Sequence, residues 1–569
     1  MTDMTFPLLS ILIFLPLAGA VALFLTPRRN VLFIKTFTLV CVLLEFAVSL
    51  PLYFYFDEKT SGMQFMEKMD WFPEWGVSYF LGIDGISVLL VLLTTFLTIL
   101  CVLCSWKDIK EKVKEYYIAF LFLETAMIGA LCALDLVLFY IFWELMLVPM
   151  YLLIGIWGGP RRIYAAIKFF LFTMLGSVLM LLAIMALYFH YYNETGLYSF
   201  YLLELYISDI PVVKQYWLFA AFALSFAIKV PMFPFHTWLP DAHTEAPTAG
   251  SVILAGVLLK MGTYGFLRFA IPLFPTAAFA AVPIISILAI AGIIYGAIMC
   301  IMQTDLKRLV AFSSVSHLGF VMLGIFAFNM QGVEGGIYQM LNHGISTGGL
   351  FLVVGMIYER RHTRMIADFG GLSKVMPVLA IFFMIITLSS IALPGTNGFV
   401  GEFLILLGTF RSNMLYGILA ATGVILGAVY MLWMFQRVMF GEVTKEENRK
   451  LHDIGKREKL ILAAIVFLVI LMGVYPKMFF KKMDATVAGY LDYIKGKNSY
   501  YIFLEMHQGE TAVTPEDGKA EFDNTGYSSK KAFRGVSPGY SAFHTSYISG
   551  DRFQIYPQDH GRDMDLWFL

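Results

Sequence analysis

Charged side chains are scarce in this sequence of 569 residues: Asp, Glu, Lys and Arg together make up 14% of it, whereas hydrophobic residues make up 59%. The formal net charge is zero and no block rich in Lys and Arg stands out, which argues against a nucleic-acid partner. A mean hydropathy of +0.73 is typical of a chain embedded in a lipid bilayer. The sequence therefore predicts an all-α polytopic membrane protein, with the bilayer as its obligatory partner.

Cysteine is scarce as well. The five cysteines all lie inside apolar stretches, and their spacing fits neither a zinc site nor an iron–sulfur cluster. We therefore expect no disulfide framework, no metal and no cofactor in this chain, and we interpret Cys101 and Cys104 as packing residues. The first residues lack the basic region of a cleaved signal peptide, so Pro7–Thr26 is expected to remain as the first spanning helix.

Apolar segments of membrane-spanning length recur along the chain with short connectors between them. We predict about fourteen spans, at residues 7–26, 32–55, 84–105, 115–133, 135–157, 165–190, 215–234, 250–271, 278–302, 306–328, 335–358, 374–410, 414–440 and 458–476. Grouped into parts, the prediction gives three N-terminal helices (1–114), a first repeat (115–271), a second repeat (272–440), a last helix (441–476) and a polar C-terminal extension (477–569).

The connectors alternate in charge. Clusters of Lys and Arg all fall in connectors on one predicted side, and the intervening connectors are acidic or nearly uncharged, as the positive-inside rule expects. This pattern predicts that both termini lie on the outer face of the membrane. The basic connectors contain Arg28, Arg29, residues 107–114, Arg161, Arg162, Lys307, Arg308, Arg360, Arg361, Arg364 and residues 445–459.

Two of the predicted spans contain interruptions. Pro231 and Pro234 follow Lys229 in the seventh, and the twelfth contains Pro394 and Gly395. Because proline lacks a backbone donor and glycine tolerates non-helical dihedral angles, we expect both helices to break at these points. Broken helices in corresponding positions of two similar halves indicate a binding or transfer site in secondary transporters. No sequence identity strong enough to prove a repeat relates the halves.

Ionisable side chains occur deep inside otherwise apolar segments. A charge at the centre of a spanning helix costs about 2.5–3.5 kcal/mol on insertion scales, so each needs a partner, a bundle interior or water. The default interpretation of such residues is a path for ions. The residues are Glu144, Lys229, Lys260, His343 and Glu402.

Each of these residues has a functional and a structural interpretation. Glu144 is expected to pair with Lys229, because pairing makes either charge tolerable in a low dielectric. Alternatively Glu144 is a protonated carboxyl group that binds a neighbouring helix, and Lys229 extends to the membrane surface. Because burial disfavours the charged form, Lys260 is expected to take up and release a proton near neutral pH. Glu402 is the predicted terminal proton site, or else a protonated carboxyl group that ties two helices together.

Histidines complete the predicted path. His317 and His343 occupy mid-helix positions, and imidazole exchanges protons near neutral pH; each could instead be an ordinary core residue. The hydroxyl groups of Ser313, Ser314 and Ser316 are expected to hold water beside His317. Four further residues are secondary candidates: Glu124 as an extension of the polar line, Asp135 as a helix start, and His236 and His243 as caps or gates.

Four strings carry a resemblance to a known family. They are residues 139–159 around Glu144, residues 229–262, residues 305–319 (DLKRLVAFSSVSHLG) and residues 393–403 (LPGTNGFVGEF). They resemble the M-type antiporter-like subunits of respiratory complex I, the NADH:quinone oxidoreductase, which are similar to the large subunits of Mrp-type sodium/proton antiporters. The resemblance covers residues 1 to about 476, and it does not extend to the tail beyond residue 497.

The resemblance implies two inverted five-helix repeats with broken helices seven and twelve. It implies a proton pathway through Glu144, Lys229, Lys260, His343 and Glu402, with His317 as a further member. Glutamate in helix twelve matches the M type, since the L and N relatives carry lysine there.

The resemblance also implies a proton-translocating subunit with no redox centre of its own. FMN, iron–sulfur clusters and quinone are then expected in partner subunits, with L-type and N-type neighbours in a bacterial cytoplasmic membrane. The alternatives are an Mrp-type antiporter subunit, the pump subunit of a membrane-bound hydrogenase, or a purely helix-binding role for the polar residues.

Overall fold

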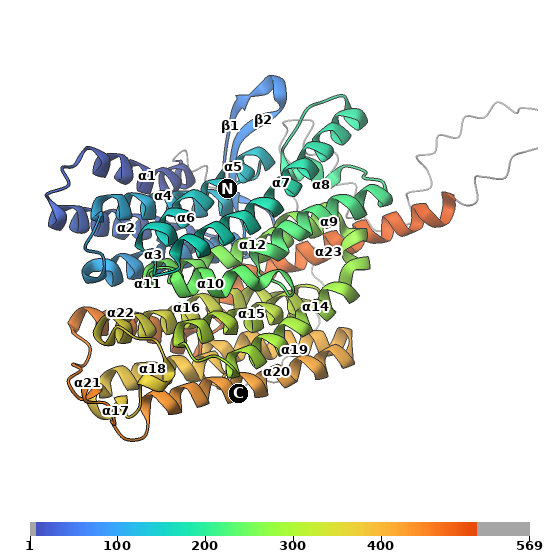
Figure 1. Cartoon of the computed structure of the whole chain (residues 1–569). Coiled ribbons are helices and arrows are strands. Elements are labelled where there is room, and N and C mark those ends of the chain that lie inside the picture. The colour runs from blue at the N-terminus through green and yellow to red at the C-terminus, as the bar shows by residue number, and fades with distance from the viewer. Residues whose placement is uncertain (1–6, 509–569) are drawn as a thin grey trace, which may run out of the picture. The chain divides into compact units, whose positions relative to one another are not determined.

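The computed structural model describes residues 7–508, and side chains as far as residue 502. Most of these residues are helical, and many of the long helices run side by side (Figure 1). The first half contains α1 (Leu8–Leu25), α2 (Val31–Phe54), α3 (Ser87–Asp108), α4 (Val113–Cys132), α5 (Leu136–Leu145), α6 (Leu147–Trp157), α7 (Arg162–Thr195), α8 (Leu202–Ile207), α9 (Val212–Lys229), α10 (Trp238–Glu245), α11 (Thr248–Ile253), α12 (Leu259–Gly265) and α13 (Ile271–Leu273).

The second half contains α14 (Pro275–Ile301), α15 (Leu306–Ile325), α16 (Met330–Arg361), α17 (Leu372–Val375), α18 (Pro377–Ser390), α19 (Asn397–Ser412), α20 (Met414–Met439), α21 (Glu446–Arg449), α22 (Lys456–Val474) and α23 (Lys477–Gln508). Short 3-10 turns are η1 (Pro73–Trp75), η2 (Phe235–Thr237) and η5 (Ile366–Asp368). Two π-helical segments, η3 (Leu254–Leu258) and η4 (Phe266–Ala270), flank α12.

The described residues contain 12 helices that are long and apolar enough to cross a membrane, or 13 if α22 and α23, which meet at a bend of 65°, form one span. The predicted all-α polytopic membrane fold is thereby confirmed. Every predicted span coincides with a helix or a broken helix. The segment 374–410 is the broken pair α18 and α19, each too short to be counted by itself. The total of fourteen spans and the inverted repeats stay predictions.

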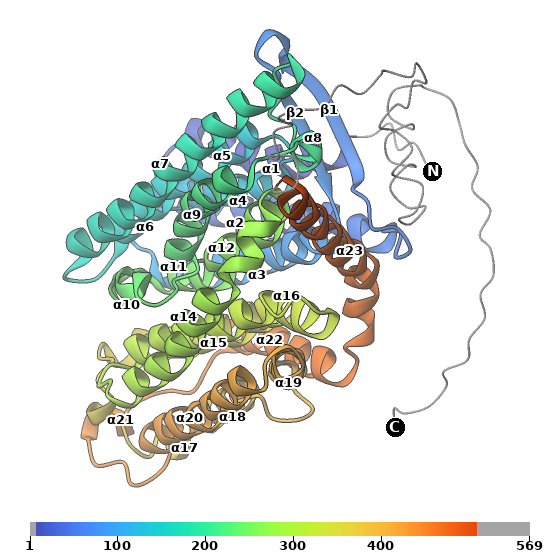
Figure 2. The same ribbon diagram turned by 90° about the vertical axis from the view of Figure 1, so that its right-hand side faces the viewer.

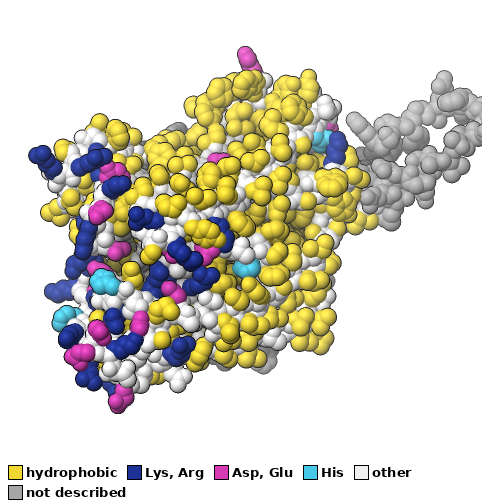
Figure 3. All heavy atoms as spheres, viewed as in Figure 1, with side chains coloured by type: hydrophobic (Ala, Val, Ile, Leu, Met, Phe, Trp, Pro, Cys, Tyr) yellow, Lys and Arg dark blue, Asp and Glu magenta, His cyan; other side chains and the backbone are white. Residues whose placement is uncertain are grey.

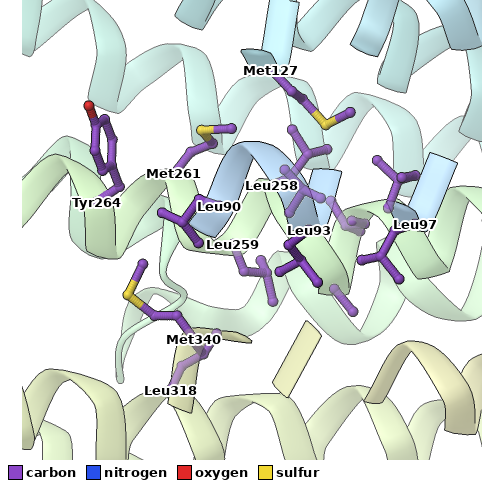
Figure 4. Packing of buried hydrophobic residues seen from close by; sticks show 14 of the residues in the cluster. Leu90, Leu93, Leu97, Met127, Leu258, Leu259, Met261, Tyr264, Leu318 and Met340 are labelled. Carbon is purple, nitrogen blue, oxygen red and sulfur yellow. The ribbon is translucent and has the colours of Figure 1, made fainter. Parts of the chain in front are cut away.

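The central helical run, from Thr248 to Leu273, is buried along its whole spanning window. Leu258 and Leu259 on this run pack against the leucine-rich face of α3, which includes Leu93 and Leu97 (Figure 4). Glycines let the backbones approach closely here: a Cβ added to Gly262 would lie 2.8 Å from the carbonyl oxygen of Phe226. The run that carries Lys260 is therefore held directly against the end of α9.

The basic connectors gather at one end of the bundle, where Figure 3 shows Lys and Arg side chains clustered beside a largely hydrophobic surface. Ion pairs join connectors that are distant in the sequence. Arg28 contacts Glu115 at 2.6 Å, while Arg161 and Arg308 both contact Asp241, at 3.9 and 3.4 Å. The predicted clustering of these connectors on one side is thus confirmed.

The connector between α2 and α3, which sequence analysis treated only as an acidic loop, contains a β-hairpin. β1 (Gln64–Phe72) pairs antiparallel with β2 (Val77–Ile83), with Gln64 opposite Ile83 and Phe72 opposite Val77. The turn needs Gly76, whose φ of +64° is left-handed. Glu67 ties β1 to the start of α1 by accepting hydrogen bonds from the Leu9 and Ser10 amides at 2.6 and 3.0 Å.

The first part of the predicted polar extension, residues 477–508, forms the helix α23. Figure 2 shows α23 crossing from the α22 side of the molecule towards α8 and the hairpin. Its buried residues Met483, Val487, Leu491 and Ile494 form one amphipathic stripe, which is not a continuous apolar run and so escaped a search for such runs.

Contacts with the same chain hold α23 in place. The Gly85 amide donates to Thr486 Oγ1 at 3.1 Å, Lys482 pairs with Glu58 at 2.8 Å, and the Ile210 amide donates to the Tyr501 hydroxyl at 3.0 Å. The sequence leaves two interpretations for the tail: disorder, or docking of its aromatic side chains on a neighbouring subunit. Of these aromatics, Tyr501 binds its own chain and Tyr500 is exposed. The others, Tyr527, Tyr540, Tyr547, Tyr556, Trp567 and Phe568, lie outside the described residues.

We predict that α23 can pack in its observed position only because Gly85 has no side chain. A Cβ at this position would lie 2.1 Å from the Lys482 carbonyl oxygen, so Gly85→Ala should destabilise the protein by about 1–3 kcal/mol, the usual cost of overpacking. The measurement is the thermal unfolding temperature of the purified protein in detergent. Gly427→Ala is the matched control, because a Cβ there meets nothing within 4 Å; equal unfolding temperatures for both variants would contradict the prediction.

Candidate functional site

Both predicted helix breaks are present. α9 ends at Lys229, and the chain continues through the Pro231–Pro234 region and η2 into α10. α18 ends at Ser390 and α19 begins at Asn397, and between them Ala392 and Gly395 have φ values of +60° and +88°. The breaks place Lys229 at the C-terminus of one half-helix. They also place Glu402 near the N-terminus of the other.

Lys260 and His343 are in direct contact. Lys260 Nζ lies 2.6 Å from His343 Nδ1 and donates to the Ala255 carbonyl oxygen at 2.5 Å. The acceptor carbonyl belongs to the π-helical segment η3, and π-helical turns occur frequently at functional sites. Lys260 and His343 are only 1% and 2% exposed. The contact between the two nitrogens therefore lies inside the bundle, away from lipid and bulk water.

His317 lies between His343 and Glu402. The rings of His317 and His343 have centroids 5.7 Å apart, and His317 Nδ1 lies 3.1 Å from Glu402 Oε1. Gln339 Nε2 also donates to Glu402 Oε1, at 3.0 Å. On the other side of the imidazole, Ser390 Oγ lies 3.4 Å from His317 Nε2. Four of the predicted residues thus form one buried line from Lys260 to Glu402.

A small polar cavity lies between the two histidines. The space open to the centre of a water molecule is about 10 Å³, which is room for about one water. His343 Nε2, which has no hydrogen-bond partner among the described residues, belongs to a side chain on its wall. The lining residues are His317, Gln339, Asn342, His343, Ser346, Thr347, Ser389, Ser390 and Gly398.

The serines predicted to hold water beside His317 do something else. Ser313 and Ser314 donate to the Val310 carbonyl oxygen of their own helix, and Ser316 donates to Ile293 on α14. Helical serines often bond back to a carbonyl one turn earlier; in all three serines the single donor of the hydroxyl group is used within the protein. Ser390, which comes from the break before α19, is the hydroxyl group that faces His317.

Lys229 and Glu144 lie near each other without a closed ion pair among the described residues. Lys229 Nζ has no hydrogen-bond partner and lies 5.2 Å from the centroid of Trp143 and 5.8 Å from that of Phe169. Glu144, next to Trp143, is close enough to act electrostatically on Lys229. The amino group of Lys229 thus lies near two aromatic rings and within electrostatic reach of Glu144, without a direct ion pair.

The secondary candidates differ in what they do. Asp135 starts α5, as predicted, by accepting from the amides of Val137 and Leu138 at 2.9 and 3.1 Å. His236 stacks on Phe233, with centroids 5.7 Å apart. His243 is buried against Phe351 at 4.7 Å, and both of its ring nitrogens lack partners in the described structure. Glu124 is fully buried on α4, and neither of its carboxyl oxygens has a hydrogen-bond partner in the described structure.

Sequence analysis missed the neutral members of the site. Gln339 and Asn342 bind each other and tie α16 to α19, since Asn342 Nδ2 donates to Gln339 Oε1 at 3.0 Å and to the Asn397 carbonyl oxygen at 2.8 Å. The spacing of Gln339, His343 and Ser346 places them on one helix face, which is a signal that could have found them. The buried Arg268–Asp84 ion pair, at 2.6 Å, was also missed.

Comparisons with known proteins agree with this geometry. A family model described as NADH:quinone oxidoreductase/Mrp antiporter, TM matches residues 133–428, and one described as NADH-ubiquinone oxidoreductase chain 4, amino terminus, matches residues 8–134. NADH-quinone oxidoreductase subunit M of Rhodobacter capsulatus is 49% identical over 496 residues, which cover 84% of this chain and 96% of that protein. The chain belongs to the M-subunit family of complex I.

Other relatives extend the family. NADH-ubiquinone oxidoreductase chain 4 of Marchantia polymorpha is 45% identical, covering 86% of this chain and 97% of its own length. A chain of respiratory complex I from Thermus thermophilus with bound NADH superposes with a TM-score of 0.78 at 31% identity, over 85% of this chain and 99% of that one. A chain of the Mrp complex from Dietzia sp. has a TM-score of 0.75 at 19% identity, over 87% and 100%, and therefore shares the fold alone. The buried charged residues described above are compatible with a proton-translocating member of the family.

Asn397 is predicted to hold the second break in shape. Its side chain accepts from Ser389 Oγ at 2.5 Å and donates to Ser346 Oγ at 3.3 Å. Asn397→Ala leaves buried hydroxyl groups with fewer partners, so the free energy of unfolding should fall by about 1–3 kcal/mol. Thermal unfolding of the purified protein measures this loss. Asn193→Ala, at an exposed asparagine, is the control; an equally small effect at both positions would contradict the role given to Asn397.

Proposed function

We propose that the chain is a proton-translocating membrane-arm subunit of an NADH:quinone oxidoreductase. Protons move along its buried chain of Glu, Lys and His residues, driven by quinone reduction elsewhere in the complex. The observation that carries this proposal is the direct Lys260–His343 contact, continued through His317 to Glu402. Structural interior bonds in membrane proteins are ordinarily made by neutral residues, whereas every member of this line can exchange a proton.

The geometry supports a relay in which each imidazole takes a proton on one nitrogen and releases one from the other. The Lys260 ammonium group gives a proton to the lone pair of His343 Nδ1 and becomes a neutral amine. The His343 ring, now protonated on both nitrogens, releases the proton on Nε2 into the cavity, where one water carries it towards His317. His317 takes up a proton on Nε2 and delivers the proton on Nδ1 to Glu402 Oε1.

Lys229 and Glu144 supply the control over this relay. When the two separate, the positive charge of Lys229 is no longer balanced, and a positive charge acts against protonation of Lys260 in a low dielectric. A shift of two pKa units corresponds to about 2.7 kcal/mol. Moving one proton against 100 mV requires about 2.3 kcal/mol. A perturbation of this size, relayed from adjacent subunits, is therefore sufficient to drive the transfer.

The orientation follows from the charge of the connectors. The end of the bundle that carries the Lys and Arg side chains is assigned to the cytoplasm by the positive-inside rule, which places both termini on the periplasmic side of a bacterial cytoplasmic membrane. L-type and N-type antiporter-like subunits are the proposed neighbours. FMN, iron–sulfur clusters and quinone belong to other subunits of the proposed complex.

An Mrp-type antiporter or a pump subunit of a membrane-bound hydrogenase has the same requirement for buried lysines. A chain of an archaeal membrane-bound sulfane sulfur reductase superposes with a TM-score of 0.74 at 22% identity, over 92% of this chain and 87% of that one, which shows the shared fold alone. Purification of the native complex followed by mass spectrometry separates these functions. Companion subunits with flavin and iron–sulfur clusters support the proposal, and a set of small antiporter subunits would contradict it.

Replacing either central lysine should uncouple pumping from electron transfer. Lys260→Met removes the donor to His343, and Lys229→Ala removes the controlling charge, so each should lower NADH-driven proton pumping about tenfold or more, an effect of at least about 1.4 kcal/mol. The measurement is the quench of a pH-sensitive dye in proteoliposomes that contain the purified complex, with assembly checked by its subunit composition.

Lys450→Ala is the control, because Lys450 is exposed. It should leave pumping at the wild-type rate. Full pumping by an assembled Lys260→Met or Lys229→Ala complex would defeat the proposed relay.

A further inference from the structure

A buried ion pair lies at the end of the bundle opposite the basic connectors. Asp84 follows β2 and precedes α3, whose other end runs into the basic residues 107–114, and Arg268 lies in η4, which belongs to the central run. Arg268 Nη2 is 2.6 Å from Asp84 Oδ1, and the two residues are 6% and 2% exposed. The proposed relay uses neither residue. The pair therefore calls for a separate explanation.

Hydrogen bonds fix both members of the pair. Asp84 Oδ1 also accepts from two backbone amides at the start of α3, each at 3.0 Å. Arg268 Nε donates to the Tyr264 hydroxyl oxygen at 3.1 Å. That hydroxyl group donates its own proton to the Leu131 carbonyl oxygen on α4, at 2.9 Å. The single proton of Tyr264 is thus directed towards α4 and away from the ion pair.

The pair and Lys260 lie on the same helical run. Lys260 and Tyr264 are four residues apart in α12, and this spacing places both on one helix face. Arg268 lies four residues further on and contacts Tyr264 directly. At about 1.5 Å per residue, Arg268 is roughly 12 Å along the run from Lys260. Polar side chains therefore continue from Lys260 towards the outer end of the bundle, where Arg268 meets Asp84.

α23 holds both chain segments that carry the pair. On one segment, the Gly85 amide donates to Thr486 Oγ1 of α23 at 3.1 Å. On the other, the Tyr206 hydroxyl group donates to the Arg268 carbonyl oxygen. The Tyr206 carbonyl oxygen in turn accepts from the Tyr493 hydroxyl group of α23 at 2.6 Å. The two members of the ion pair are therefore anchored to one helix at the outer end.

We propose that the Arg268–Asp84 pair is a barrier to protons, which closes the outer end of the central run and keeps protons from leaking between Lys260 and the outer face. A guanidinium group stays charged in proteins, so it cannot pass a proton on. Arginine also forms an electrostatic barrier that excludes protons in aquaporin-type channels. The barrier is a property of the ion pair itself, whereas its benefit to Lys260 rests on the proposed pumping function.

Passive proton permeability tests the barrier without turnover. Proteoliposomes that contain the purified complex receive a pH gradient in the absence of NADH, and a pH-sensitive dye inside them follows its decay. Arg268→Gln removes the charge and keeps a hydrogen-bond donor. The protein-dependent decay should become at least about tenfold faster, the change in rate given by a barrier lower by about 1.4 kcal/mol. Arg268→Lys keeps a cation and should hold the gradient as the wild type does.

Arg360→Gln is the matched control. Arg360 pairs with Glu458 at 2.7 Å at the end of the bundle that carries the basic connectors, so this variant breaks a similar ion pair without opening the outer end. Slow decay with Arg268→Gln would overturn the proposal. Fast decay with Arg268→Lys or with Arg360→Gln would also overturn it, because a leak that does not follow the charge at residue 268 indicates loosened packing.

A double variant tests the connection to Lys260. If the leak opened by Arg268→Gln passes through Lys260, the variant Lys260→Met/Arg268→Gln should hold the gradient as the wild type does. Fast decay in the double variant would overturn this connection. If Lys260→Met alone pumps normally, the proposed relay fails, and the passive decay with Arg268→Gln still decides whether the ion pair is a barrier.

Discussion

The structure depends on the cost of leaving a charge unpaired where neither water nor lipid headgroups can reach it. Lys260 is tolerated at the centre of the bundle because His343 and the Ala255 carbonyl oxygen receive its donors. The same constraint explains the rest of the line, in which His317 and Gln339 both bind Glu402. Of these partners, His343 and His317 can also exchange a proton, whereas the Ala255 carbonyl oxygen and Gln339 only hold a charged group in place. In the proposed relay, the contacts of the two histidines therefore serve both stability and transport.

Irregular backbone places polar groups beside the ionisable side chains of the site. A π-helical turn presents the Ala255 carbonyl group to Lys260, and the break before α19 brings Ser390 to His317. Non-helical backbone inside a membrane protein is tolerated only where it lines a cavity or is buried in protein. The cavity beside the histidines is lined in part by residues on either side of this break, Ser389 and Ser390 at the end of α18 and Gly398 at the start of α19. On the side of the central run that faces α3 the packing is apolar, with the leucines of α3 against Leu258 and Leu259.

Much of this arrangement could be predicted from the sequence, because hydrophobic length fixes spanning helices and a buried charge stands out against apolar neighbours. Both helix breaks could also be predicted, from Pro231 and Pro394, because proline lacks the backbone donor that a helix needs. Gln339 and Asn342 were missed because neutral amides are common, and their importance comes only from what they touch. The β-hairpin and α23 were missed because their apolar residues are periodic, so neither forms a continuous run. Whether Glu144 forms a direct ion pair with Lys229 depends on packing distances, which the sequence pattern does not determine.

The most direct test is an experimental density map of the assembled complex at a resolution that shows ordered water. The account predicts Lys260 Nζ at hydrogen-bond distance from His343 Nδ1, and one water in the cavity joining the two imidazole rings. A Lys260 side chain turned away from His343, with the space between the histidines filled by apolar side chains or lipid, would contradict it.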